Sequence, residues 1–368
     1  MEIIKKLKGR DGFRLNSCCR GEAGRMENTI LRSRFDVQDI DETMRYEVWA
    51  DSISCIFDVD TEKELRQSDA FVAAIEAFRF DDFMLANTTT VETDWWRTPF
   101  HVARDGLDHY MIQLFLRGGM RWQSPRGSGE VNTGDLIVFD MAEEMQSHTS
   151  DFNHISLILP RSRLAPLLKN PDGQHMRCLR KGTPIAELLS DYMILLDRNL
   201  PALNYNQLRP LLPSVLSMVA VCLNDADDPD QSMTLLRHWR MKHQIKNMIA
   251  KSLSDQKLSP NMICDELDVS RSNLYRLFEE EGGVKNFIRQ QRLKRSLNIL
   301  MRDSRAMVSQ VADECGFSSP SDFCRVFRNQ YGLSPRDARR NNISTRRNRQ
   351  EDELDREYEG WLHGLAGN

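Results

Sequence analysis

The chain has 368 residues, of which 40% are hydrophobic and 28% are charged. This composition is typical of a folded globular protein and excludes one that is mainly disordered. No apolar run approaches the roughly 20 residues of a membrane-spanning helix, and residues 1–16 lack the apolar stretch and cleavage site of a secretory signal. We therefore expect a cytoplasmic protein without a membrane span, whose eight scattered cysteines are reduced thiols.

The net charge of −4 conceals an uneven distribution along the chain. Residues 233–349 hold 23 Lys and Arg against 12 Asp and Glu, whereas the rest of the chain holds 27 basic and 42 acidic residues. A basic block on an acidic protein indicates a nucleic-acid surface, because phosphates attract it and counterion release drives binding. A solvated basic face without a partner is the alternative that charge alone leaves open.

The N-terminal half reads as a β domain. Residues 1–45 are polar and weakly patterned, and translation could start at Met26 rather than Met1. Residues 110–116 alternate as a strand does before Gly118 ends the pattern, and residues 127–141 and 152–160 add short strands separated by turn residues. The pattern predicts one enclosed β unit, a small barrel or sandwich.

Beyond Pro160 the apolar period changes from two to about 3.6 residues. Thr183 and Pro184 begin a predicted helix, and residues 206–223 form a second one. The apolar stripe of the first helix consists of Ile185, Leu188, Leu189, Tyr192 and Leu196. The two helices provide either a self-association face or a cover for the β unit, so that one sensor domain spans 46–223. The acidic, Pro-containing stretch that follows predicts a linker over 224–236.

The basic block contains an internal sequence repeat. SRSNLYRLFEEEGG begins at Ser270, and SPSDFCRVFRNQYG begins 49 residues later at Ser319. Each serine is a good N-cap, and each follows a predicted helix and a tight turn, the second turn at Gly316. Residues 237–341 are therefore expected to form an all-α domain with two helix-turn-helix units, followed by a charged tail over 342–368.

The second helix of each unit has a buried face and an exposed one. The residues expected on the exposed faces are Arg271, Ser272, Asn273, Tyr275 and Arg276 in the first unit, and Ser321, Cys324, Arg325 and Arg328 in the second. Arginine binds guanine edges bidentately, while Ser and Asn approach bases or phosphates. Eighteen helical residues of the connector within 284–303 would be about 27 Å long, so both helices can enter successive major grooves of double-stranded DNA.

The stretch GGVKNFIRQQRLKRSLNILM, followed by VSQVADECGFSSPSDFCRVFRNQYGLSPRDAR, resembles the DNA-binding domain of AraC/XylS-type bacterial transcription regulators. The resemblance covers about a hundred residues, from 240 to 340, and its most specific features are Gly316-Phe317, the Phe323 and Phe327 pair, Gly332 and Ser334-Pro335. It implies base contacts from Ser272, Tyr275, Arg276, Pro320, Ser321, Cys324 and Arg325. The chain departs from the family pattern with Asp268 at a usual turn glycine and with Pro320 and Cys324 at positions that are often polar.

The N-terminal half is similar, more weakly, to the cupin-like barrel of such regulators, through GDLIVFDM and ISLILPRSRL. The resemblance implies an α+β protein: an N-terminal cupin-like β-barrel with a helical dimerisation segment, then a C-terminal all-α domain with two helix-turn-helix motifs. It also implies a transcription activator at the bacterial nucleoid, with promoter DNA, RNA polymerase, a small-molecule effector and a second copy of the chain as partners. No cofactor is expected.

The alternative is a cupin-type metal-dependent enzyme fused to a DNA-binding domain. Such a site needs clustered histidines, yet His101, His109, His148 and His154 are irregularly spaced and residues 118–140 contain none. We therefore expect neither a catalytic residue nor a metal site.

Two further features stay open at this point. Trp95 and Trp96, with His101 behind them, could line an effector pocket, or one ring could pack in the core while the other lies on the surface. The tail carries a balance of −5 from Gln350 onward. It is either simply solvated or weakens non-specific DNA binding by repulsion.

Overall fold

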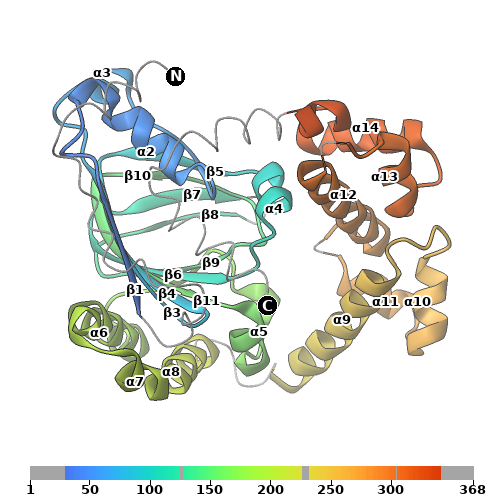
Figure 1. The fold of residues 1–368 in the computed structure, drawn as a ribbon. Helices are drawn as coiled ribbons and strands as arrows, with labels where there is room; N and C mark the ends of the chain where they lie inside the picture. Colours follow the sequence, from blue (N-terminus) through green and yellow to red (C-terminus); the bar gives the residue numbers. More distant parts are fainter. Residues whose placement is uncertain (1–29, 125–126, 226–231, 280, 304, 341–368) are drawn as a thin grey trace.

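The computed structural model describes residues 30–124, 127–225, 232–279, 281–303 and 305–340 (Figure 1). A β-rich domain is followed by a helical domain, which confirms the predicted α+β organisation. The strands are β1 (Leu31–Asp36), β2 (Asp58–Asp60), β3 (Ala73–Phe80), β4 (Phe83–Thr90), β5 (Thr93–Arg97), β6 (Tyr110–Arg117), β7 (Met120–Ser124), β8 (Gly127–Val131), β9 (Leu136–Asp140), β10 (Met145–Thr149), β11 (Phe152–Leu159) and β12 (Arg177–Leu179).

Two antiparallel sheets face each other in the β-rich domain. The larger has the order β1-β3-β4-β11-β6-β9-β12, and the smaller has the order β2-β5-β10-β7-β8. One apolar core lies between them and includes Met84, Trp95, Phe115 and Phe152. This arrangement matches the predicted barrel or sandwich, because each sheet must bury one face against the other.

The edge of the larger sheet is a strand from the polar N-terminal segment. Strand β1 lies within residues 1–45, yet it pairs with β3 along its whole length, from Leu31 opposite Arg79 to Asp36 opposite Ala74. Strand β1 thus joins the larger sheet from within the segment that was predicted to precede residue 46, and the sequence pattern does not reveal it. The reason is that β1 is an edge strand, so that only Ser33 of its six residues is buried and its sequence carries little apolar signal.

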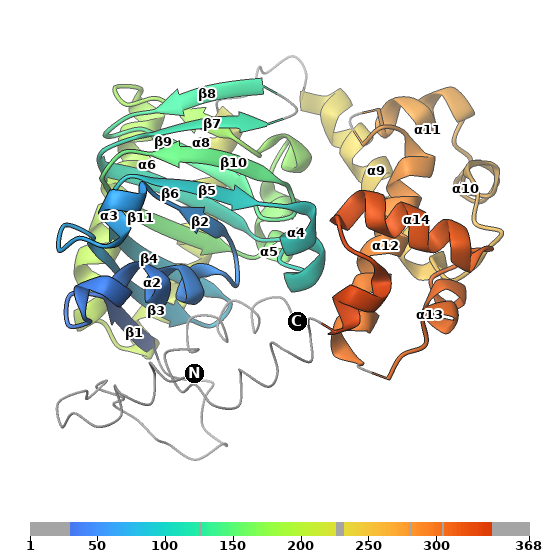
Figure 2. The ribbon, with the colours of Figure 1, turned by 90° about the horizontal axis from the view of Figure 1, so that it is seen from above.

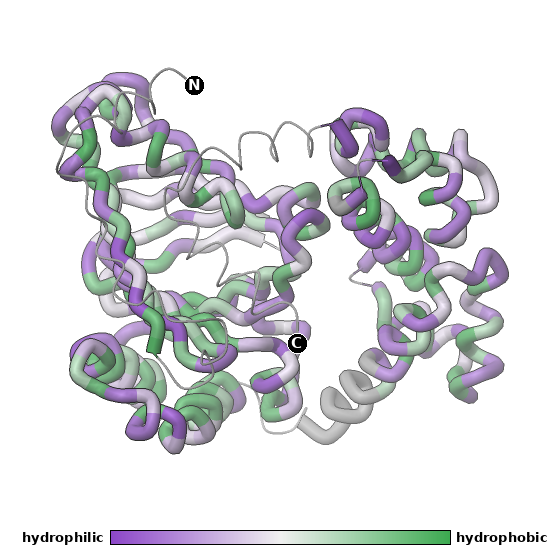
Figure 3. Tube along the Cα trace, in the orientation of Figure 1, coloured by the Kyte–Doolittle hydropathy of each residue, from purple (hydrophilic) through white to green (hydrophobic). Residues whose placement is uncertain are grey.

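Short helices surround the sheets, and two longer ones cover the larger sheet. They are η2 (Glu42–Met44), α2 (Arg45–Ile53), α3 (Lys63–Arg66), α4 (Pro99–Asp105), α5 (Arg161–Leu164), η3 (Ala165–Leu167), η4 (Pro171–Gly173), α6 (Pro184–Asn199), η5 (Leu200–Ala202), α7 (Tyr205–Leu208), η6 (Arg209–Leu211) and α8 (Leu212–Asp225). Leu189, Met193 and Val215 share a core with Ile112 and Leu157 of the sheet's outer face. Helices α6 and α8, rich in hydrophobic positions, lie under this sheet in Figure 3.

Both faces of the larger sheet are thus buried, which explains why β6 is apolar at successive positions rather than only at alternate ones. The predicted stripe on α6 is correct except at Leu188, whose side chain is 55% exposed. Ala186 and Met193 complete the buried face in its place.

The helical domain consists of α9 (Ser232–Ser252), α10 (Pro260–Leu267), α11 (Arg271–Leu277), α12 (Val284–Arg302), α13 (Val308–Glu314) and α14 (Pro320–Tyr331). Helix α8 runs to Asp225 and α9 starts at Ser232, so both helices extend into the stretch predicted as a linker over 224–236. The domain has two cores: Ile263, Leu274 and Phe278 belong to one, and Val311, Phe323 and Phe327 to the other.

Candidate DNA-binding surface

The first helix-turn-helix unit consists of α10 and α11. Ser259 caps α10 by accepting the amide of Met262, and Ser270 caps α11 by accepting the amide of Asn273. Between them Asp268 adopts a left-handed conformation with φ of 50°. Aspartate tolerates this region better than most residues, which explains how the turn forms without the glycine that is usual there.

Helix α11 separates its residues as the period predicts. Leu274 and Leu277 are buried, and the predicted DNA-contacting side chains lie on the other faces: Arg271, Ser272 and Arg276 are exposed, and Asn273 and Tyr275 are half-buried. Arg276 donates to Asn273 Oδ1 at 3.0 Å, and the guanidinium of Arg271 lies 5.8 Å from the centre of the Tyr275 ring. These contacts preorganise polar groups that can form hydrogen bonds with bases and phosphates.

The second unit, α13 and α14, has a glycine turn. Gly316 adopts φ of 77°, and a Cβ there would lie 2.5 Å from the carbonyl oxygen of Leu253. Ser319 caps α14 by accepting the amide of Asp322, and Pro320 occupies the first turn. Helix α14 ends at Gly332, which is also left-handed. The turn between α13 and α14 thus needs glycine at position 316, both for the backbone angle and for the close approach of the segment at Leu253.

Helix α14 buries Phe323, Val326, Phe327 and Tyr331 against the core. The predicted contacts Pro320, Ser321, Arg325 and Arg328 are exposed, and Cys324 is half-buried. Arg325 pairs with Asp322 at 2.5 Å, so this carboxylate orients the arginine. DNA phosphates or bases would have to compete with that exposed pair, which water already screens.

Helix α12 connects the two units, as predicted, but its basic residues are not all free for DNA. Arg292 donates to the carbonyl oxygens of Leu253 and Asp255 at 3.1 and 2.6 Å. Lys294 lies toward the sensor domain, where burial lowers its pKa against the opposing charges of Asp105 and Asp108. Sequence periodicity could not reveal these roles, since both depend on segments distant in the chain.

Helix α4 of the sensor domain packs on the DNA-binding domain (Figures 1 and 2). Ala103 lies in the same core as Leu293 and Leu297 of α12, and Phe100 packs against that core. Helix α4 starts with a capping box. The Thr98 side chain accepts from the backbone of His101, and the His101 side chain accepts from the backbone of Thr98. Burial lowers the pKa of His101, which keeps its ring neutral so that Nδ1 can accept the Thr98 amide at 3.2 Å.

A group of charges forms a second contact between the domains. Asp172 in η4 lies 3.2 Å from both Arg161 and Lys246 of α9, and Lys242 and Lys246 also pair with Glu281 at 3.0 and 3.6 Å. Burial of Asp172 opposes its ionisation, but the charges of Lys246, Arg161 and Lys242 outweigh this effect and hold its pKa below the usual range. The carboxylate therefore stays charged between the domains.

Of the residues suggested for an effector pocket, Trp95 and Trp96 lie on opposite faces of β5. Trp95 faces the core between the sheets, where its ring packs on Trp49, Phe57 and Phe152 and Nε1 donates to Thr149 at 3.0 Å. Trp96 is the next residue along β5, so its side chain lies on the opposite face of the sheet and is half-buried. His101 belongs to the cap of α4. Ordinary packing, one ring inside and one outside, is what the structure shows.

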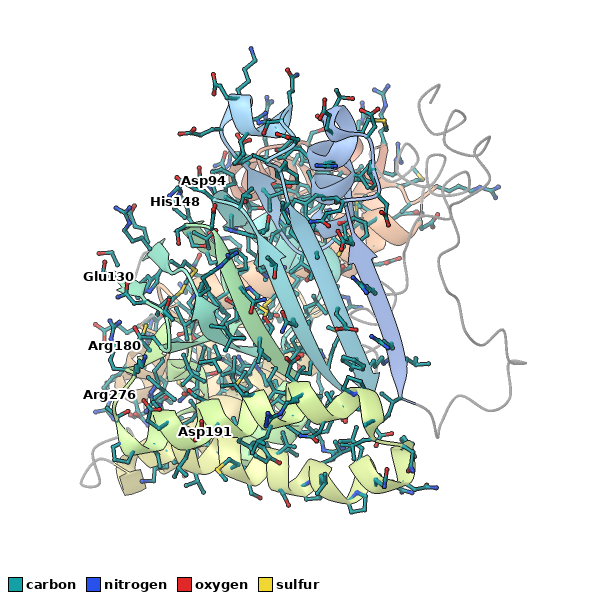
Figure 4. All side chains as sticks on the ribbon, turned by 90° about the vertical axis from the view of Figure 1, so that its left-hand side faces the viewer. Asp94, Glu130, His148, Arg180, Asp191 and Arg276 are labelled. Atoms are coloured by element: carbon teal, nitrogen blue, oxygen red, sulfur yellow. The ribbon has the colours of Figure 1, made fainter. Side chains whose placement is uncertain are left out.

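The four histidines of the enzyme alternative lie on different elements. His148 of β10 bonds Asp94 of β5 at 3.0 Å and pairs with Glu92 at 3.1 Å, and Figure 4 shows His148 and Asp94 next to each other. His154 is buried and stacks on Phe152. Within the described ranges, no three His, Cys, Asp or Glu side chains come together as a candidate metal site. The helices in those ranges include none with the length and apolar character to cross a membrane.

Two family models match the chain. One, described as a helix-turn-helix domain, covers residues 263–341, and the other, described as an AraC-binding-like domain, covers residues 49–224. The Msm operon regulatory protein of Streptococcus mutans is 32% identical over 236 residues, which are 62% of this chain and 83% of that protein. The transcriptional activator NphR of Rhodococcus is 22% identical over 244 residues, 65% of this chain and 72% of that one.

A solved structure of an AraC-like transcriptional activator, CuxR, is similar in fold. It matches with 24% identity and a TM-score of 0.50, over 72% of this chain and 94% of that chain. The order of the two family models along the chain agrees with the β-rich domain followed by the helical domain.

Proposed function

The chain belongs to the AraC family of bacterial transcription regulators, and we propose that it reads two successive major grooves of promoter DNA with α11 and α14. The proposal rests on the exposure of polar side chains on both helices: Arg271, Ser272 and Arg276 on one, and Ser321 and Arg325 on the other. Helix α12 is the spacer between them, and 19 residues at about 1.5 Å each give it the length of most of a DNA turn.

The decisive experiment removes one arginine from each recognition helix. Binding sites would be found by genome-wide DNA occupancy, and affinity for one site would then be measured by fluorescence anisotropy at physiological salt. Arg276→Ala and Arg325→Ala should each cost about 1–3 kcal/mol of binding free energy and relax base preference at one position. Arg305→Ala, an exposed arginine outside both helices, is the matched control. Unchanged affinity in both variants would refute the assignment.

The sensor domain controls this binding through α4. Because α4 packs on both α12 and α14, a change at the sensor domain can shift the second helix-turn-helix unit relative to the first. Both recognition faces remain exposed while α4 is docked, so docking would set the spacing of the two units rather than cover their DNA-binding residues. A sliding or releasing helix at such an interface is a common two-state element.

A small polar effector would bond polar side chains that face the interior between the two sheets. The hydroxyls of Thr90 and Ser147 are buried there, and neither has a hydrogen-bond partner among the described residues. A buried hydroxyl without a partner costs free energy, so a ligand that bonds both would stabilise the sensor domain. Trp95 and Trp49 form the apolar wall beside them.

Self-association through α6 and α8 completes the proposal. Leu188 and Leu195, seven residues apart on α6, are 55% and 49% exposed, and Val221 of α8 is 57% exposed. Asp191, between the two leucines in sequence, is labelled on α6 in Figure 4. A dimer would place four helix-turn-helix units on one promoter. The protein would act in the bacterial cytoplasm as an activator, with RNA polymerase as its partner.

A further inference from the structure

An apolar groove lies beside the second recognition helix. It has a volume of about 620 Å³, and its walls include Met307, Val308, Pro320, Cys324 and Pro335. Met307 is 56% exposed, which is unusual for a side chain of this size and hydrophobicity. Pro320 and Cys324 belong to the face of α14 assigned to DNA, so a molecule in this groove would lie where that helix meets the duplex.

The rim of the groove is basic. Arg336 and Arg339 line it, and Arg339 is fixed there by donating to the carbonyl oxygen of Ala306 at 2.7 Å. Arg328 of α14 is exposed nearby in sequence. Asp337 lies between the two rim arginines in sequence and accepts the Ser334 hydroxyl at 2.5 Å. The groove thus suits an occupant with an apolar stripe and surrounding negative charge.

The chain itself supplies a segment of this kind. Leu354, Tyr358, Trp361, Leu362 and Leu365 recur at intervals of three and four residues, the spacing of one face of a helix. Acidic residues occupy the other sides of such a helix: Asp352, Glu353, Asp355, Glu357 and Glu359. This sequence does not belong to the residues matched by either family model.

We propose that residues 351–365 dock into this groove of the same chain as an acidic amphipathic helix and compete with DNA for α14. The path is short, because Arg339 is on the rim and only residues 341–350 separate Arg340 from the segment. Ten residues can span up to about 30 Å. A tether of this length gives a local concentration in the millimolar range, so even a weak contact is populated. Apolar anchors in a groove and acid opposite arginine supply that contact.

Photocrosslinking tests the docking without DNA. Ser309, exposed on the groove, would be replaced by p-benzoylphenylalanine in the full chain, and crosslinked peptides would be mapped by mass spectrometry. Crosslinks to residues 351–365 at the mass of a single chain are expected. Asn261, which occupies the equivalent place at the start of α10, is the matched control and should not crosslink to this segment. The proposal would be overturned if position 309 gave no crosslink to residues 351–365, or if such crosslinks formed only between chains.

A double-mutant cycle tests the competition, which rests on the DNA binding proposed above. The dissociation constant for a mixed-sequence 20-base-pair duplex would be measured by anisotropy at low salt. Trp361→Ala with Leu362→Ala should tighten binding about three- to tenfold, and Met307→Ser should do the same. Combining them should add nothing further, because both remove one contact. His363→Ala, on the opposite side of the predicted helix, should change little.

Three results would separate the ideas. The competition would be contradicted if the two changes altered the dissociation constant by factors that multiply in the combined variant, or if neither change had an effect. A duplex that no variant binds would contradict the proposed function while the crosslink still reported on docking. Crosslinks from Ser309 to a different protein, with none to residues 351–365, would overturn the docking and assign the groove to that partner.

Discussion

Arg97 holds Asp105 through two parallel hydrogen bonds of 2.7 and 2.9 Å, with side chains that are 1% and 0% exposed. Arg97 also donates to the carbonyl oxygens of Met141 and Ile56. The pair therefore fixes the C-terminal end of α4, the helix that touches the DNA-binding domain, to strand β5 and to the loop segments at Met141 and Ile56.

Removing the carboxylate should destabilise the sensor domain strongly. Asp105→Ala leaves a buried guanidinium without its partner, and we expect a loss of about 3–5 kcal/mol in the free energy of unfolding. Urea unfolding would measure it. Asp51→Ala, at an exposed position of α2, should stay within about 0.5 kcal/mol. Equal effects of the two substitutions would contradict the role given to the pair.

A charge in the α4 interface should separate the domains. Ala103 is 3% exposed and packs among the apolar side chains of α12, so Ala103→Glu would bury an unpaired carboxylate unless the interface opens. We expect a larger radius of gyration by small-angle X-ray scattering. Ala202→Glu, at an exposed position, is the control. An unchanged radius with Ala103→Glu would count against α4 as the contact.

Alanine substitution at the two left-handed glycines of the second unit should lower the free energy of unfolding by different amounts. Gly332→Ala should lose about 1 kcal/mol, because its φ is 72° but nothing lies within 4 Å of a new Cβ. Gly316→Ala should lose more, since the Cβ would also approach Leu253 O to 2.5 Å. Chemical denaturation followed by circular dichroism compares them. Equal losses would show that the backbone moves away at no cost.

The stability of the sensor domain should fall in mild acid. Burial lowers the pKa of His154 to about 4 from the usual histidine value of 6.5, so below about pH 6.5 the unfolded chain takes up a proton that the folded chain does not. The free energy of unfolding should drop by about 1.4 kcal/mol between pH 7.5 and 5.5 through this group, and further until about pH 4.

The neutral variant His154→Gln isolates that contribution. Its dependence on pH over the same range should be shallower by about 1.4 kcal/mol, whatever its stability at pH 7.5. Tryptophan fluorescence during urea unfolding reports mainly on the sensor domain, which contains Trp49, Trp95, Trp96 and Trp122. Parallel curves for the two proteins would contradict a depressed pKa for His154.

A charge on the exposed face of α6 should block self-association. Leu195→Glu places a carboxylate at a side chain that is 49% exposed, so the monomer should fold normally while a dimer through this face would bury the charge. Light scattering after size exclusion would give the mass. Leu167→Glu, 45% exposed on η3, is the control. A dimer that survives Leu195→Glu would place the interface elsewhere.

The sequence by itself determined the local features of the DNA-binding domain. Caps at Ser259, Ser270 and Ser319 and the turn at Gly316 depend on residues within one or two turns of each other. The split of each recognition helix into buried and exposed faces follows from a period of 3.6 residues alone. For the same reason the family resemblance was already readable in these hundred residues.

The tertiary structure decided what depends on segments far apart in the chain. The edge pairing of β1, the opposite directions of Trp95 and Trp96, and the packing of Ala103 on Leu293 follow from neighbours about 40 to 190 residues away. Lys294 is a basic residue of α12, and only the structure shows that it is turned toward the sensor domain. A periodic pattern shows which side chains must be covered, but only the packed chain shows what covers them.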